Sequence, residues 1–194
     1  MQKKVERETV YIETREEWRQ WLQQNHSLKQ GVWVLCNNAK SGRAVVPWSD
    51  LVNEALCFGW IDSTRKTVDY HSFVQLFGKR KKQSTWSAIN KEKVQKLIDE
   101  GQMTKAGYEC IETAKLNGSW NLLDEVEQLV IPDDLSDAFA EYDGSRTYFL
   151  SLSRSVRKML LQWIVLAKRA ETRTKRIQEV ARQAGLRQKP VQFR

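Results

Sequence analysis

The spacing of apolar residues predicts a helix near the start of the chain. Between residues 14 and 24, Trp18, Trp21 and Leu22 fall at positions i, i+3 and i+4 and therefore share one face of a helix. Thr14 is placed to cap this helix, because a threonine hydroxyl accepts a hydrogen bond from a first-turn amide. The segment is thus expected to be an amphipathic helix that buries its tryptophan face.

Short segments rich in β-branched and aromatic residues, bounded by turn signals, predict strands. They are residues 32–36 with a short partner at 45–46, residues 60–61, and residues 67–77. Because these strands are few, short and interspersed with helical segments, the sequence predicts a small antiparallel sheet packed against helices.

Cap and stop residues place further helices along the chain. One begins at Ser49 and stops at Gly59, one runs from Ser84 to about Glu100, and one covers residues 104–116. After Pro132 the pattern is helical throughout, with segments at 133–142, from about Ser153 onward, and around 177–184. The expected fold class is α+β: a main domain over residues 1–120, followed by an all-helical C-terminal appendage over residues 131–194.

The composition is that of a soluble globular protein. The chain has 194 residues, of which 41% are hydrophobic and 29% are charged, which suits one domain with a helical appendage. No apolar run approaches the roughly eighteen residues of a transmembrane helix. The N-terminal segment also lacks the apolar stretch of a secretory signal. We therefore expect no transmembrane segment and a cytoplasmic location.

Positive charge is concentrated towards the C-terminus. The formal net charge is +8, but residues 151–194 alone carry twelve Lys and Arg and two acids, a net of +10. Basic helices of this kind can contact nucleic acid or an anionic membrane surface, and Arg173, Lys175 and Arg176 are the candidate polyanion contacts. In the alternative interpretation, an apolar stripe that includes Trp163 docks on the main domain and the basic residues face water.

The thiols and imidazoles give little sign of catalysis. Three cysteines without a CxxC spacing and two histidines predict neither a metal site nor a cofactor. Asp69 and His71, two residues apart on a predicted strand, can be combined with Ser63 or Ser84 as a hydrolase triad, but no nucleophile elbow accompanies them. A small enzyme acting on an anionic substrate is therefore the weaker alternative.

Residues 55–90 combine aromatic and cationic groups. A basic turn, Lys79–Lys82, precedes the helix expected to begin at Ser84. The first amides of a helix, its dipole and nearby cations together make an anion site. The residues predicted to line this aromatic, cationic groove are Trp60, Asp62, Arg80, Ser84, Trp86 and Asn90. In the alternative interpretation Ser84 only caps the helix, both tryptophans lie in the core, and the cations are solvated.

A family resemblance is carried by two motifs, ALCFGWIDS and, after the basic turn, STWSAIN. They resemble the YdeI/OmpD-associated proteins, which are also called the bacteriocin-protection family. The similarity continues through Gly101–Thr104 and Gly118–Trp120, and in the tail through Trp163–Ile164 and Glu171–Arg173. The resemblance implies no reaction and no catalytic residues. The family name implies protection against bacteriocins and association with an outer-membrane porin.

Two classes of function remain open. The first is a non-enzymatic binding or stress-protection protein that takes a small anionic ligand in the groove. The second is a nucleic-acid or anionic-surface binder that uses the basic C-terminal helices. A steep loss of affinity with salt marks the second class, because phosphate contacts release counterions.

Overall fold

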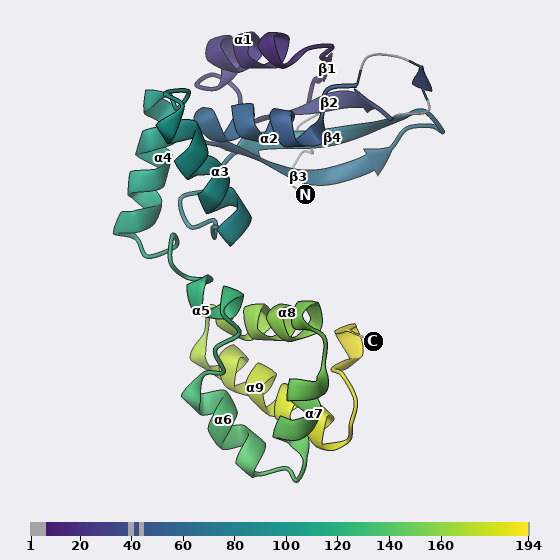
Figure 1. The fold of residues 1–194 in the computed structure, drawn as a ribbon, viewed down its shortest axis with the longest axis vertical. Helices are drawn as coiled ribbons and strands as arrows, with labels where there is room; N and C mark the ends of the chain where they lie inside the picture. Colours follow the sequence, from purple (N-terminus) through teal and green to yellow (C-terminus); the bar gives the residue numbers. More distant parts are fainter. Residues whose placement is uncertain (1–6, 39–40, 43–44, 194) are drawn as a thin grey trace, which may run out of the picture. The chain divides into compact units, whose positions relative to one another are not determined.

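The computed structural model describes residues 7–38, 41–42 and 45–193. The chain forms two compact units; in Figure 1 the first is mainly purple to teal and the second mainly green to yellow. The first unit comprises Met1–Thr85 and Ile89–Trp120, and the second comprises Trp86–Ala88 and Asn121–Arg194. A sheet and helices in the first unit and helices in the second make the fold α+β, as the sequence predicted.

The first unit is built on a four-stranded sheet. Its strands are β1 (Thr9–Tyr11), β2 (Gly31–Asn37), β3 (Trp60–Thr67) and β4 (Ser72–Lys79), in the order β1-β2-β4-β3. The three longer strands pair antiparallel, as predicted. The short strand β1 pairs parallel with β2, because a helix lies between them in the chain and returns it in the same direction.

The predicted strand at Val45–Val46 is wrong, because these two residues lie in an irregular segment. The reason is that both edges of β2 are already occupied. On one side β1 pairs with Trp33 to Leu35. On the other side β4 pairs with the whole of β2 from Gly31 to Asn37.

Two helices cover one face of the sheet (Figure 1), namely α1 (Arg15–Asn25) and α2 (Trp48–Cys57). Thr14 caps α1 as predicted, since its hydroxyl accepts from the amide of Glu17 at 3.1 Å. Trp18 is fully buried, and its ring centroid lies 5.3 Å from that of Phe77 on β4. Helix α2 begins one residue before Ser49, and Pro47 occupies its N-cap position. The helices α3 (Ala88–Asp99) and α4 (Lys105–Leu116) follow the sheet in the chain.

The second unit is helical. Its elements are α5 (Asp124–Glu127), α6 (Asp133–Ala140), α7 (Ser145–Ser151), α8 (Arg154–Val165), α9 (Ala170–Gly185) and the short 3-10 helix η2 (Val191–Phe193). The apolar stripe of α8 is buried inside this unit, with Leu160, Leu161 and Ile164 in its core. Trp163 is half-buried at the edge of that core and meets Phe193 edge-on.

None of the helices in the described ranges is both long enough and apolar enough to cross a membrane.

Candidate functional site

The basic turn at the end of β4 borders a cavity of about 340 Å³ in the first unit, here called the Arg80 cavity. The side chains that give it charge are Lys79, Arg80, Lys82 and Glu109, and its other walls include Trp60, Cys110 and Thr113. Three cations against one carboxylate make the cavity electropositive. It is therefore suited to an anion that is small enough to enter it.

Arg80 is the most constrained of these cations. Its main-chain amide donates to the carbonyl of Gly59 at 2.9 Å, and its Nη2 donates to the carbonyl of Thr85. Burial lowers the pKa of Arg80 to about 10, although the charges of Cys110 and Asp62 act in the opposite direction. A guanidinium stays protonated at neutral pH even so. The guanidinium of Arg80 is therefore charged beside the cavity, although burial has removed much of its hydration.

Asp62 lies close enough to Arg80 for their charges to interact. It projects from β3 on the face covered by α2, because it pairs with Phe77 in the register of the sheet. Burial raises the pKa of the Asp62 carboxyl, whereas a hydrogen bond from Trp48 and the charges of Arg80 and Lys93 lower it. Asp62 therefore balances part of the positive charge around Arg80.

Trp60 and Trp86 lie in the protein interior, with exposed fractions of 0% and 1%. The indole of Trp60 donates to the carbonyl of His26 at 3.3 Å and meets the ring of Trp21 edge-on. Trp60 thus contributes to the wall of the Arg80 cavity, but neither tryptophan offers an exposed ring face for stacking. The expected aromatic floor is not formed by these two residues, and ligand binding by the predicted set stays a prediction.

The predicted helix start at Ser84 is wrong, because α3 begins at Ala88. Ser84 instead lies in a turn, in which its amide donates to the carbonyl of Lys81 at 2.9 Å. The amide of Ala88 donates to Oε1 of Glu127 at 3.3 Å, and Glu127 is also paired with Lys158 at 2.6 Å. A carboxylate of the chain itself therefore occupies the place that we had expected an external anion to take.

Ser84 and Asn90 are not among the residues that line the Arg80 cavity. Ser84 lines a second cavity in the first unit, together with Ser63 and Lys81. Asn90 lies in the first turn of α3 and is half-buried. Of the six residues predicted for one groove, Trp60 and Arg80 line this cavity, and Asp62 is close enough to Arg80 for their charges to interact. Ser84, Trp86 and Asn90 are not among the residues that line it.

Two family models match the chain. The first, described as Domain of unknown function (DUF8412), matches residues 10–110, which is more than half of the chain. The chain belongs to this family. The second, described as Bacteriocin-protection, YdeI or OmpD-Associated, matches residues 128–185. This match confirms the family resemblance seen in the sequence. No curated protein and no solved structure matches the chain.

The three candidate polyanion contacts all lie on α9, within the second of these matches. Arg173 forms a bidentate pair with Asp134, with distances of 2.7 and 2.9 Å. Arg176 donates to the carbonyl of Trp163 and lies over its ring. Lys175 is exposed. Two of the three cations thus serve the packing of the helical unit, which weakens the case for a phosphate-binding tail.

The structural role of Arg173 can be tested by Arg173→Gln. The bonds from Arg173 lower the pKa of the Asp134 carboxyl, so the pair contributes stability at neutral pH and loses it as pH falls through the lowered pKa. Because the pair is partly exposed, the variant should lose about 0.5–1 kcal/mol of unfolding free energy at pH 7. The difference from the parent should begin to shrink at about pH 4, the ordinary pKa of an aspartate, and should vanish only below the lowered pKa of Asp134. Urea unfolding across that range measures both effects.

Lys175→Gln is the matched control for that experiment, because Lys175 lies on the same helix and is exposed. Lys175→Gln should leave the unfolding free energy unchanged across the whole of this pH range. Equal destabilisation by the two variants would contradict the role assigned to the Arg173–Asp134 pair.

The triad considered for Asp69 and His71 is not formed. Oδ1 of Asp69 accepts from the amide of His71 at 2.7 Å and from the hydroxyl of Ser72 at 2.9 Å. These bonds close the turn between β3 and β4, and they lower the pKa of Asp69. The hydroxyl of Ser63 donates to the carbonyl of Leu76. The carboxylate thus has a structural role in the turn.

The three thiols are poor nucleophiles. Burial raises the pKa of Cys36 and of Cys57 to about 11. Burial also raises the pKa of Cys110, in the wall of the Arg80 cavity, even though Arg80 acts in the opposite direction. At neutral pH these groups are protonated, and a protonated thiol attacks a substrate slowly.

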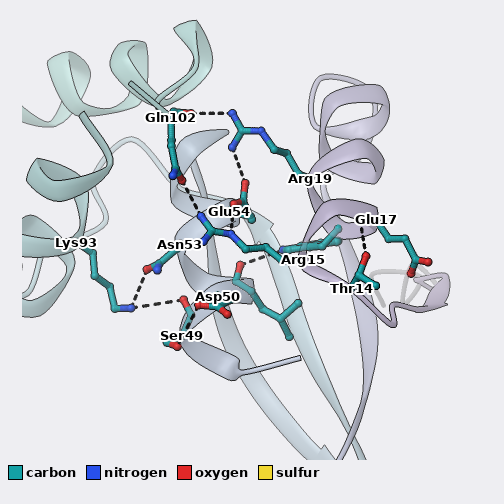
Figure 2. A network of polar contacts seen from close by, with 12 residues as sticks. Thr14, Arg15, Glu17, Arg19, Ser49, Asp50, Asn53, Glu54, Lys93 and Gln102 are labelled. Carbon is teal, nitrogen blue, oxygen red and sulfur yellow. Dashed lines mark hydrogen bonds and ion pairs between the residues drawn. The ribbon is translucent and has the colours of Figure 1, made fainter. Parts of the chain in front are cut away.

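Sequence reasoning missed a buried ionic cluster between α1 and α2 (Figure 2). Glu54 is 2% exposed, and its two carboxylate oxygens accept from Arg15 and Arg19, each at 2.6 Å. Both arginines also donate to Gln102. The available signal was a glutamate inside the apolar stripe of α2, preceded by a helix with two arginines four residues apart.

Proposed function

We propose that the protein is a non-enzymatic binding protein that takes a small anion, such as a carboxylate or phosphate, in the Arg80 cavity. Binding there would serve a protective role of the kind that the name of the bacteriocin-protection family describes. The proposal concerns the first unit, which holds every residue of the cavity.

The observation that carries this proposal is a largely buried arginine beside an electropositive cavity. Arg80 keeps its charge at a cost in hydration, and Lys79 and Lys82 add further positive charge at the same cavity. An anion in the cavity would replace lost hydration with charge-assisted hydrogen bonds. The raised pKa of Cys110 favours binding over covalent chemistry, because the thiol in the wall is not a thiolate at neutral pH.

Binding of a small anion should raise the melting temperature of the protein. Phosphate, sulfate, acetate and benzoate are compared with chloride at matched ionic strength, and affinity is measured by isothermal titration calorimetry. A ligand at one hundred times its dissociation constant stabilises the folded state by about 2.7 kcal/mol, so the shift should be readily visible. Arg80→Gln should abolish it.

Two further variants separate binding from folding, because Arg80 also bonds to the main chain. Lys82→Gln removes a cation of the cavity wall and should weaken binding by about tenfold, equal to 1.4 kcal/mol. Ala106→Leu should fill the cavity and abolish binding while the protein stays folded. Lys105→Gln is the matched control on the exposed side of α4, where Lys105 is 92% exposed, and it should bind like the parent. If Ala106→Leu binds anions as tightly as the parent, the proposed binding in the Arg80 cavity is wrong.

A further inference from the structure

The sheet of the first unit has a second face that α1 and α2 do not cover (Figure 1). Along β2, Val32, Val34 and Cys36 are buried, whereas the alternate residues Trp33 and Leu35 are only half-buried. Side chains of a strand alternate between the faces, so Trp33 and Leu35 lie on the face away from those helices. Leu76 and Val74 of β4 are their register partners and share that face.

A cavity of about 400 Å³ lies at one end of this face, here called the sheet cavity. Its floor includes Ile61 and Leu76, and its polar walls include Arg7, Lys81, Ser63 and Ser84. Lys79 also borders it, and none of the lining residues that the structure describes is acidic. Cations with hydroxyl donors and without a carboxylate match the chemistry of a phosphate group.

The Arg7 side chain lies close to Gly31, where the lack of a side chain leaves room for it. A Cβ atom added at Gly31 would lie 3.3 Å from Nε of Arg7 and 3.0 Å from the carbonyl oxygen of Phe77. Within the described ranges, no ion pair engages Arg7 or Lys81. Both cations are exposed, so both can reach a phosphate that enters the cavity.

An aromatic ring lies next along the same face. Trp33 follows Gly31 by two residues on β2, a rise of about 7 Å, and Leu76 is its register partner. Nζ of Lys66 lies 4.8 Å from the centroid of the Trp33 ring. The face therefore carries cations at both ends of an apolar strip, with one tryptophan between them.

We infer that this sheet face binds single-stranded nucleic acid. One phosphate binds in the sheet cavity to Arg7, Lys81 and the hydroxyl of Ser84. Lys66, which lies over the Trp33 ring, moves to the next phosphate, and a base stacks on Trp33 in its place. A flat ring between two phosphate-binding points matches a strand of at least two nucleotides rather than an isolated phosphate. A base offers its π face whatever its sequence, so the face should bind with little sequence preference. This inference uses neither Arg80 nor the tail.

The test is fluorescence anisotropy of labelled ten-nucleotide oligothymidylate and oligouridylate against the full chain over a range of salt concentrations. Binding should be measurable at low salt and should weaken with a log–log slope of about −0.7 for each phosphate contacted. Trp33→Leu should weaken binding by about tenfold or more. Lys81→Gln and Lys66→Gln should each weaken it and flatten the slope by about 0.7.

Matched control variants test where on the protein the oligonucleotide binds. Trp48→Leu removes a tryptophan that is 51% exposed at the start of α2, and Lys105→Gln removes an exposed cation of α4. Both should bind like the parent. Trp33→Phe keeps a stacking ring and should retain most of the affinity, which guards against a merely misfolded Trp33→Leu protein.

Several results would overturn the inference: no binding at low salt, parental binding by Trp33→Leu, or binding of a mononucleotide as tight as that of the ten-nucleotide strand. The same holds if Lys175→Gln weakens binding as much as Lys81→Gln does, because the strand would then lie on the tail. Failure of the parent protein to bind small anions in the Arg80 cavity would leave this inference intact, since Arg7, Lys81 and Lys66 do not line that cavity.

Discussion

Glu54→Gln should destabilise the protein by about 3 kcal/mol in urea unfolding at pH 7. Glu54 is 2% exposed and balances two guanidinium groups, so its neutralisation leaves Arg15 and Arg19 without a counter-charge in the interface of α1 and α2. Removal of one partner from a buried ionic cluster typically costs about 3–5 kcal/mol. We expect the lower end, because the two arginines are 34% and 36% exposed and can turn towards water.

Two further variants test this prediction. Glu109→Gln is the surface control, since Glu109 is 66% exposed and pairs only loosely with Lys105 at 3.8 Å; it should change stability by less than about 0.5 kcal/mol. A triple variant with Arg15→Met, Arg19→Met and Glu54→Leu should recover most of the loss, because an apolar replacement removes every buried charge at once. Parental stability of Glu54→Gln would show that the cluster does not stabilise the helix pair.

Gly107→Ala should destabilise the protein by about 1–3 kcal/mol, although alanine is the better helix former. Gly107 lies in α4, and a Cβ atom there would come within 2.4 Å of the carbonyl oxygen of Cys57 and 2.3 Å of Sδ of Met103. The Met103 side chain can move, but the carbonyl cannot, because it accepts from the amide and the hydroxyl of Thr104 at 3.2 and 2.6 Å. The substitution must therefore push α4 away from α2, which is the cost of overpacking.

The sign of the change decides this prediction. Helix propensity alone would make Gly107→Ala more stable by about 1 kcal/mol, so a higher melting temperature than the parent would contradict the close approach of the two helices. In a Met103→Ala background the sulfur contact is gone but the carbonyl contact remains. Gly107→Ala should still be destabilising there, as measured by urea unfolding of the single and double variants.

Local signals predicted the candidate site only in part. The basic turn, its aromatic neighbours and Asp62 could be found because they are close in sequence. Burial could not be found in this way, because it depends on which elements pack over a residue. Trp60 is covered by α1 through Trp21 and the carbonyl of His26. The helix start moved from Ser84 to Ala88 because a turn at Lys81 uses the amide of Ser84.

The sequence by itself determined the local elements and the family. The cap Thr14, the helix start near Ser153 and the stripe with Trp18 and Leu22 were readable, because capping and helical periodicity depend on residues within about four positions of one another. The motifs around the basic turn and the residues of the tail together suggested the family whose model matches residues 128–185. The motifs around the turn themselves lie within the match to the domain of unknown function, over residues 10–110.

Only the tertiary structure decided which distant residues meet. It paired Arg15 with Glu54 and Arg173 with Asp134, both across 39 positions in the chain. It placed β1 parallel to β2, and it set the basic turn between two cavities. Contacts of this kind depend on how whole elements pack against one another, so they cannot be predicted from the periodicity of a single segment.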